Sequence, residues 1–229
     1  MFNASWGILF MLVNFALFLL CYRFFGVKGL YAWVGIATLL ANIQVVKTIE
    51  MLGIVMTLGN TIYASIYMTT DLLNEKFGPK AAKKAVWIGF FSLIASTIIL
   101  QMVLVFEPQA EDFAQEPMEI LFGLMPRLVI GSLAAYFISQ MLDVRLFSRI
   151  RNRFSQSNQF WIRINGSTLV SQMVDSLVFC TIAFAGVFSL QVWLEILLTT
   201  YLFKSLISIL GTPVLYIARR FKHPDDAAV

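Results

Sequence analysis

Seven long apolar stretches run along this chain, and they constrain its fold more than any other feature. A helix needs about 20 mostly apolar residues to cross a bilayer core of about 30 Å. Each stretch is too long and too uninterrupted for a β-barrel strand, which would alternate apolar and polar residues over about 10 positions. The sequence therefore predicts an all-α integral membrane protein with about seven transmembrane helices. The predicted spans are 5–22, 29–46, 51–72, 85–106, 119–142, 164–186 and 192–217.

The composition excludes several other classes of protein. The chain is 59% hydrophobic and 13% charged, whereas a soluble domain has about 45–50% apolar and about 25% charged residues. A soluble fold of this size could not bury so many apolar side chains. An ordinary cytosolic enzyme, a disordered regulator and a nucleic-acid-binding domain are therefore excluded, and the lipid bilayer is an expected partner. Cys21 and Cys180 lie in apolar runs and suggest no disulfide framework, and the one histidine, His223, makes no metal site.

The charges predict the orientation of the spans. Of the 17 Lys and Arg residues, 14 fall in the segments 23–28, 76–84, 145–163 and 219–222. These are alternate connections and the C-terminal region, as the positive-inside rule requires of cytoplasmic segments. The connection 107–119 carries five acids and no base, so we expect it outside. The N-terminus is then outside and the C-terminus cytoplasmic. We interpret the first stretch as a retained anchor helix rather than a signal peptide, because its positive charges follow the apolar run.

Asp175 and Lys204 are the charges expected deepest in the membrane. At 1.5 Å per residue, Asp175 lies about 18 Å beyond Arg163 and Lys204 about 22 Å before Arg219. Both positions are near the midplane, on two helices that a short connection makes antiparallel neighbours. Two readings are open: a buried ion pair that fixes helix register, or the wall of a polar cavity. Buried ion pairs add little stability by themselves, so we favour the functional reading.

Further polar side chains follow helical spacing beside this pair. Any of them could instead bond a neighbouring helix, and Tyr67 and Asp71 could equally be an interface belt and a helix-end cation partner. Lys47 and Glu50 are expected to cap the outer turn after the second span. The polar positions are Asn42 and Gln44 in the second span, Asn60, Tyr63, Tyr67, Asp71 and Asn74 in the third, Gln172 in the sixth and Tyr201 in the seventh.

Motifs for chemistry are missing from the sequence. It contains no GxxxxGK[ST] for ATP, and no HExxH, CxxC or GxSxG for metal or nucleophilic catalysis. We therefore expect no enzyme activity, no catalytic residues, no metal and no cofactor.

Three ordered blocks resemble the queuosine precursor transporter family, also described as vitamin uptake transporters. They are TDLLNEKFG at 70–78, FISQMLDVRLFSRIR at 137–151 and VDSLVF at 174–179. The resemblance implies a multi-pass importer of the bacterial inner membrane for 7-deazaguanines, namely preQ0 or preQ1. It implies a six-helix core at 29–220, similar to the substrate-binding components of energy-coupling-factor transporters. The extra N-terminal helix and first loop are then 1–28, and the cytoplasmic tail is 221–229.

The resemblance also marks polar positions. Those that match the family pattern are Asn42, Asp71, Asn74, Glu75, Gln140, Asp143, Gln172, Asp175 and Lys204. Gln172 stands near a place where the family pattern predicts Gly-Asn.

A deazaguanine presents an N1–H and an exocyclic amine that a carboxylate such as Asp175 can accept together. Amides at Asn42, Gln44 and Gln172 could serve its acceptors, and Tyr63, Phe179 and Tyr201 could stack on its ring. Lys204 could neutralise Asp175 when the site is empty.

Other functions stay open at this point. The alternatives are uptake of another vitamin or nucleobase, and a non-transporting membrane assembly subunit. Import could be facilitated, ion-coupled or driven by an energy-coupling partner, and the protein could be a homo-oligomer.

Overall fold

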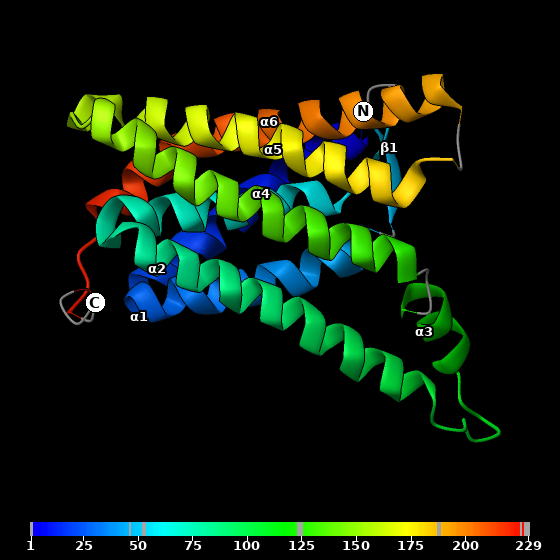
Figure 1. Cartoon of the computed structure of the whole chain (residues 1–229). Coiled ribbons are helices and arrows are strands. Elements are labelled where there is room, and N and C mark those ends of the chain that lie inside the picture. Colours follow the sequence, from blue (N-terminus) through cyan, green and yellow to red (C-terminus); the bar gives the residue numbers. More distant parts are fainter. Residues whose placement is uncertain are drawn as a thin grey trace.

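A computed structural model of the chain describes residues 2–45, 47–51, 54–122, 126–186, 189–224 and 226. Long helices lie side by side in a bundle, with a small β-hairpin and a short helix at one end and the C-terminus at the other (Figure 1). The elements are α1 (Phe2–Gln44), β1 (Thr48–Met51), β2 (Ile54–Thr57), α2 (Gly59–Leu104), α3 (Gln115–Phe122), α4 (Pro126–Arg153), the 3-10 turn η1 (Ser157–Gln159), α5 (Phe160–Phe184) and α6 (Leu190–Arg220).

Helix α1 reverses its direction at Gly26. This glycine has φ 55° and ψ −143°, a left-handed conformation that side chains disfavour. A straight helix of 43 residues would be about 64 Å long, yet the Asn3 side chain donates to the carbonyl of Glu50, just beyond the other end of α1, at 2.8 Å. The rings of Phe18 and Trp33 also meet across the reversal, with centroids 6.2 Å apart. Segments 2–25 and 27–44 are therefore antiparallel neighbours.

Helix α2 is likewise interrupted, at Gly78, where φ is 82° and ψ is 176°. Pro79 follows, and proline suits the first turn of a new helix because no N–H is needed there. Its two halves run along α4 in opposite directions. Before the break, Tyr67 contacts Ser139 and Asn74 contacts Val144, so this half is parallel to α4. After the break, Trp87 contacts Phe137 of α4, and Gln101 then contacts Phe122, which ends α3 shortly before α4 begins, so the second half is antiparallel to α4 (Figure 1).

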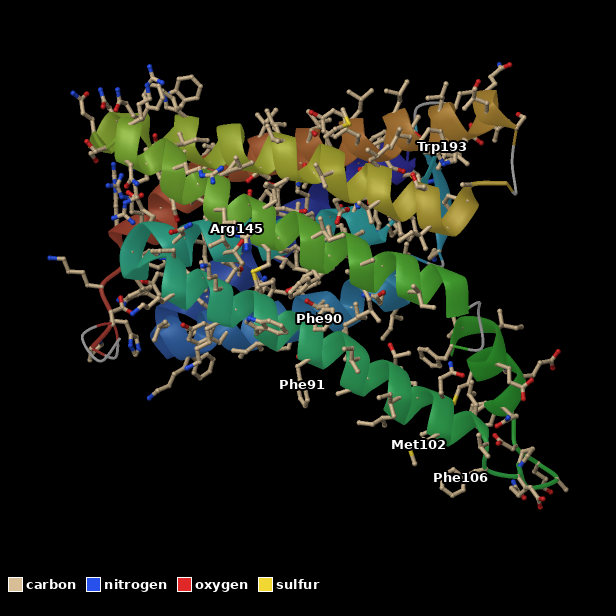
Figure 2. The ribbon with its side chains drawn as sticks, viewed as in Figure 1. Phe90, Phe91, Met102, Phe106, Arg145 and Trp193 are labelled. Atoms are coloured by element: carbon tan, nitrogen blue, oxygen red, sulfur yellow. The ribbon has the colours of Figure 1, made fainter. Side chains whose placement is uncertain are left out.

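Apolar side chains cover the outside of the bundle. On the second half of α2 and just beyond its end, Phe91, Met102 and Phe106 are 72%, 63% and 75% exposed and point away from the other helices, whereas Phe90 packs on Phe137 (Figure 2). Such a surface suits lipid rather than water. Within the described residues, four helical segments are long and apolar enough to cross a membrane, as expected for a nearly all-helical membrane protein: Phe2–Gln44, Gly59–Leu104, Ser157–Phe184 and Leu190–Arg220.

The predicted helix boundaries are wrong after the second span. Instead of a helix from residue 51, β1 and β2 form an antiparallel hairpin in which Thr48 pairs with Thr57 and Met51 with Ile54. Five of its eight strand residues are β-branched, which favours strands. Lys47 and Glu50 belong to this hairpin rather than to a helical turn.

The predicted fifth span, 119–142, is also corrected, because α3 ends at Phe122 and α4 begins at Pro126. Residues 123–125 and the side chain of Arg127 lie outside the described part of the chain, as do residues 46, 225 and 227–229 of the predicted second span and tail.

The two ends of the bundle differ in charge. At one end the reversals at Gly26 and Gly78 meet the ends of α4, α5 and α6, which bring most of the basic residues. The contacts there include Lys76–Asp226 at 3.0 Å, Arg163–Glu75 at 2.7 Å, Arg219–Ser157 at 3.2 Å and His223–Phe24 at 3.3 Å. The acidic connection 107–119 lies at the opposite end, next to α3 (Figure 1).

Candidate functional site

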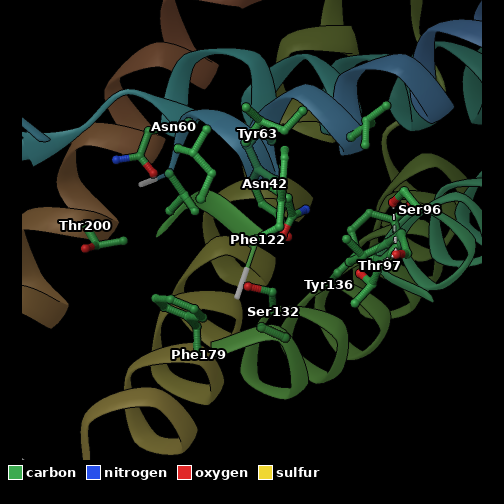
Figure 3. A pocket seen from close by; sticks show the side chains of 18 of the residues that line it. Asn42, Asn60, Tyr63, Ser96, Thr97, Phe122, Ser132, Tyr136, Phe179 and Thr200 are labelled. Carbon is green, nitrogen blue, oxygen red and sulfur yellow. Dashed lines mark hydrogen bonds between the residues drawn. The ribbon is translucent and has the colours of Figure 1, made fainter. Parts of the chain in front are cut away.

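A cavity of about 310 Å³ opens between the helices in the half of the bundle that carries the hairpin and α3. Its volume lies at the lower end of the range of small-molecule sites, about 300–1,000 Å³. Most of the wall is apolar, and a few polar side chains converge on it (Figure 3). The polar side chains of the wall are Asn42, Asn60, Tyr63, Ser96, Thr97, Gln101, Ser132, Tyr136, Thr200 and Lys204.

The inner end of the cavity rests on four bonded side chains from four segments, which we call the floor network: Tyr63, Ser139, Asp175 and Lys204. Asp175 is 1% exposed and is its centre. Its Oδ1 accepts hydrogen bonds from Tyr63 at 2.7 Å and from Ser139 at 2.9 Å. Its Oδ2 lies 2.7 Å from the Lys204 ammonium. A buried carboxylate is tolerated when it is paired and hydrogen-bonded in this way.

Tyr63 connects the floor network to the cavity. Its ring lies edge-on to the rings of Tyr67 and Tyr136, with centroids 5.8 Å and 6.5 Å away. The Lys204 ammonium is 4.6 Å from the centre of the Tyr63 ring, a cation–π distance. The ring thus separates the cavity from Asp175 while its hydroxyl holds the carboxylate.

The structure brings part of the predicted binding set to the cavity wall. Asn42, Asn60, Tyr63, Phe179 and Lys204 line it. The others do not.

Asp175 lies behind Tyr63 and Lys204, and Gln172 donates to Ser208 at 2.5 Å instead. Tyr201 is half-buried on α6, and Gln44 ends α1. The expected convergence of Asn42, Tyr63, Gln172 and Asp175 on one pocket therefore holds for the first two only.

The positions marked by the family blocks lie deeper, toward the basic end. Asn74 donates to the carbonyl of Val144 at 3.0 Å, and Gln140 accepts from Thr70 at 3.2 Å. Asp71 is 1% exposed and bonds Thr168 rather than a cation, and Tyr67 is buried on Ser139 rather than at a membrane interface. Asp143 is fully buried.

Glu75 collects three arginines, which we call the Glu75 cluster. Arg163 of α5 lies 2.7 Å from its carboxylate, Arg219 of α6 at 3.0 Å and Arg151 of α4 at 3.8 Å. Arg163 is 1% exposed. The cluster ties four helical segments together at the basic end, on the far side of Asp71 from the cavity.

Sequence reasoning missed the contribution of α4. Tyr136 lines the cavity and Ser139 holds Asp175, and both follow a polar stripe at 132, 136, 139 and 143. The helical spacing of that stripe was the available signal. Within the described residues, no group of three or more His, Cys, Asp and Glu side chains could hold a metal ion.

Comparisons with known proteins agree on one family. Residues 57–218 match the family described as "Putative vitamin uptake transporter". A "Probable queuosine precursor transporter" of Bacillus subtilis is 45% identical over 99% of both chains. A "Queuosine precursor transporter" of Escherichia coli is 31% identical over 74% of this chain and 75% of its own. A "Probable queuosine precursor transporter" of Haemophilus influenzae is 34% identical over 67% of this chain and 64% of its own. No solved structure matches.

Proposed function

Because the chain belongs to the vitamin uptake transporter family, we propose that this multi-pass bacterial membrane protein imports a queuosine precursor, a 7-deazaguanine such as preQ0 or preQ1. The observation that carries the proposal is the cavity with aromatic and amide side chains above the buried floor network. The cavity also speaks against a pure assembly subunit, whose polar residues would only bridge helices. The site contains a wall for holding a flat ring, and we propose that the substrate crosses unchanged.

The wall supplies both contacts that a deazaguanine needs. Phe179 and Tyr63 face the space from α5 and α2, and an aromatic face holds a base by stacking. Asn42 and Asn60 carry amides that can donate to and accept from the polar ring edge. The Asn42 amide nitrogen already donates to the carbonyl of Thr38 at 2.9 Å, so its oxygen is the end for the substrate.

Asp175 would be the second recognition element, after a rearrangement. Its two oxygens already accept from Tyr63, Ser139 and Lys204, and a bidentate contact with the N1–H and amine of a deazaguanine needs two free lone pairs. Oδ1 is already filled by Tyr63 and Ser139, whereas Oδ2 holds only Lys204, so the substrate has to displace one donor from Oδ1. The Tyr63 hydroxyl is the donor at the cavity wall, and its displacement makes binding and movement of α2 one event.

The orientation follows from the charge of the two ends. We place the basic end in the cytoplasm, the acidic connection 107–119 outside, the N-terminus outside and the C-terminus inside. Counting α1 and α2 as two spans each gives seven: the six-helix core at 29–220 and the extra first helix within 1–28, with the tail at 221–229. In this orientation the cavity lies toward the outside and the Glu75 cluster closes the cytoplasmic side. The structure then corresponds to an outward-facing state.

The test is rescue of queuosine salvage. A bacterial strain that cannot make preQ0 and lacks its own importer receives this gene and is fed preQ0, preQ1 or queuine, and queuosine in its tRNA is measured. We expect rescue by preQ0 or preQ1, and the Asp175→Asn variant should fail to rescue while reaching the membrane in normal amount. Rescue by none of the three compounds would exclude the substrate class. Uptake of another vitamin or nucleobase by the same cells would then identify the alternative. A requirement for a partner protein would appear as loss of uptake on reconstitution of the isolated chain.

A further inference from the structure

Two acidic side chains, Asp71 and Asp143, lie between the floor network and the Glu75 cluster, and we call them the carboxyl pair. They are 1% and 0% exposed. The first half of α2 is parallel to α4, and Tyr67 bonds Ser139 at 2.8 Å across a separation of 72 positions. Asp71 and Asp143 have the same separation and lie one turn further on, about 6 Å along both axes. Their carboxylates are therefore neighbours, and they interact directly.

The carboxyl pair is short of hydrogen-bond partners. Thr168 donates to Oδ2 of Asp71 at 3.0 Å. Oδ1 of Asp71 and both oxygens of Asp143 have no hydrogen-bond partner among the described residues. The hydroxyls of Ser167, Thr168 and Ser171, all buried on α5, also face Asp143, and that of Ser171 has no hydrogen-bond partner among the described residues. Buried polar atoms are nearly always satisfied, so this group of oxygens has room for one more ligand.

The buried positive charges of α5 and α6 are engaged elsewhere. Arg163 of α5 pairs with Glu75, and Lys204 of α6 pairs with Asp175. The nearby phenol of Tyr67 donates to Ser139. Within the part of the chain that the structure describes, no lysine or arginine lies within ion-pair distance of the carboxyl pair. Two adjacent carboxylates cannot both stay ionised in such surroundings.

We propose that the carboxyl pair binds one proton, which crosses the membrane together with the substrate. This rests on the proposed import function and adds its energy source. A proton shared between Oδ1 of Asp71 and one oxygen of Asp143 satisfies both atoms and leaves the other Asp143 oxygen for the Ser171 hydroxyl. The hydroxyls beside the carboxyl pair could also serve a sodium ion, which the experiment below tests separately.

The position of the carboxyl pair explains how proton and substrate would be linked. Asp143 is one turn from Ser139, which donates to Asp175 at 2.9 Å. Asp71 is one turn from Tyr67, which bonds that same Ser139. A substrate that rearranges the floor network therefore acts on both helical segments that hold the proton. Loss of the proton to the cytoplasm would release the same two segments.

The experiment uses the full chain in liposomes with radiolabelled preQ0, a nitrile that carries no basic amine. Exchange with equal preQ0 on both sides measures binding and crossing without any driving force. Accumulation is then measured with an acidic outside, or separately with a sodium gradient at equal pH. For one proton per substrate, one pH unit should support up to about tenfold accumulation. Asp71→Asn and Asp143→Asn should keep exchange and lose this accumulation, whereas the exposed Asp112→Asn should keep both.

Each outcome decides between the two ideas. Absence of exchange in the wild-type protein counts against the proposed function. Exchange without acid-driven accumulation, accumulation driven by sodium, or an Asp143→Asn protein that still accumulates preQ0 overturns the proton site. Infrared spectroscopy provides a readout that needs no substrate. A protonated carboxyl band should be present in wild-type protein and missing from the double variant Asp71→Asn/Asp143→Asn, and its persistence in the double variant would also overturn the proposal.

Discussion

The ammonium group of Lys204 lies 2.7 Å from Oδ2 of Asp175, in the interior of the bundle and at the inner end of the cavity. The pair joins α5 to α6, and Tyr63 and Ser139 attach it to α2 and α4. Its members differ in their surroundings, since Lys204 lines the cavity while Asp175 lies behind it. The lysine is thus the part that an incoming molecule meets first.

Removal of one partner of this pair should cost more than removal of both. Asp175→Asn or Lys204→Met leaves a buried charge without its partner, and we expect each to lower the free energy of unfolding by about 3–5 kcal/mol. The double variant should recover much of that loss but transport no preQ0. Thermal unfolding in detergent and uptake in liposomes measure the two effects. Lys222→Met, at an exposed position, is the matched control. Additive losses in the double variant would show that the two residues do not stabilise each other.

The ring and the hydroxyl of Tyr63 should have separable roles. Tyr63→Phe keeps the ring in the cavity wall and removes the hydrogen bond to Asp175, so we expect a stability loss of about 1.5–3 kcal/mol. Tyr63→Leu also removes the aromatic face, and stacking on a base is worth about 1–3 kcal/mol. The Leu variant should therefore bind preQ0 more weakly than the Phe variant, as measured by equilibrium binding. Equal affinities of the two variants would place the base elsewhere in the cavity.

The Glu75 cluster should control access from the basic end. Glu75→Gln leaves three arginines without their shared carboxylate, so the four segments should separate more often. A destabilisation of only about 1.4 kcal/mol would raise the open fraction about tenfold. The reporter is Ser167→Cys, at a fully buried position, in a chain whose Cys21 and Cys180 are replaced. Its labelling by an impermeant thiol reagent from the cytoplasmic side should accelerate with Glu75→Gln and stay slow with Asp226→Asn, which removes only the Lys76 pair.

The close packing around Gly89 should leave no room for any side chain. A Cβ there would collide with the Tyr136 hydroxyl and lie 2.9 Å from Val34 Cγ1. Gly89→Ala should cost about 1–3 kcal/mol through overpacking and should disturb the cavity wall, because Tyr136 lines it. Gly166→Ala is the control, since its Cβ would meet only the mobile end of Ile150, at 3.2 Å. Comparable melting temperatures for the two variants would contradict this account.

Most of the helices could be predicted because the length of an apolar stretch in a spanning helix corresponds to the thickness of the bilayer core. The predicted ends were too short at Gly26 and Gly78, since backbone hydrogen bonding continues through the basic residues where hydropathy has already fallen. The hairpin at 48–57 could not be separated from a span by hydropathy alone. Only its β-branched residues distinguish it.

The residue types of the candidate site could be predicted from the sequence, but their arrangement in space could not. Asp175 and Lys204 stood out because charge is rare at midplane. Which helix faces meet depends on how each helix is rotated about its axis and on which helices are neighbours. A single sequence gives neither. For that reason the sequence predicts Gln172 at the substrate although it bonds Ser208, and it does not single out Ser139, which holds Asp175.

The first half of α2 carries Tyr63, Tyr67, Asp71 and Glu75 on four consecutive turns, each bonded to a different part of the molecule. The angular position of these residues around the helix axis therefore sets the order in which they act between substrate entry and exit. One residue inserted after Tyr67 would turn everything beyond it by about 100°. Tyr63 would keep its place in the cavity, while Asp71 and Glu75 would face the wrong helices, so binding would survive and release would be lost.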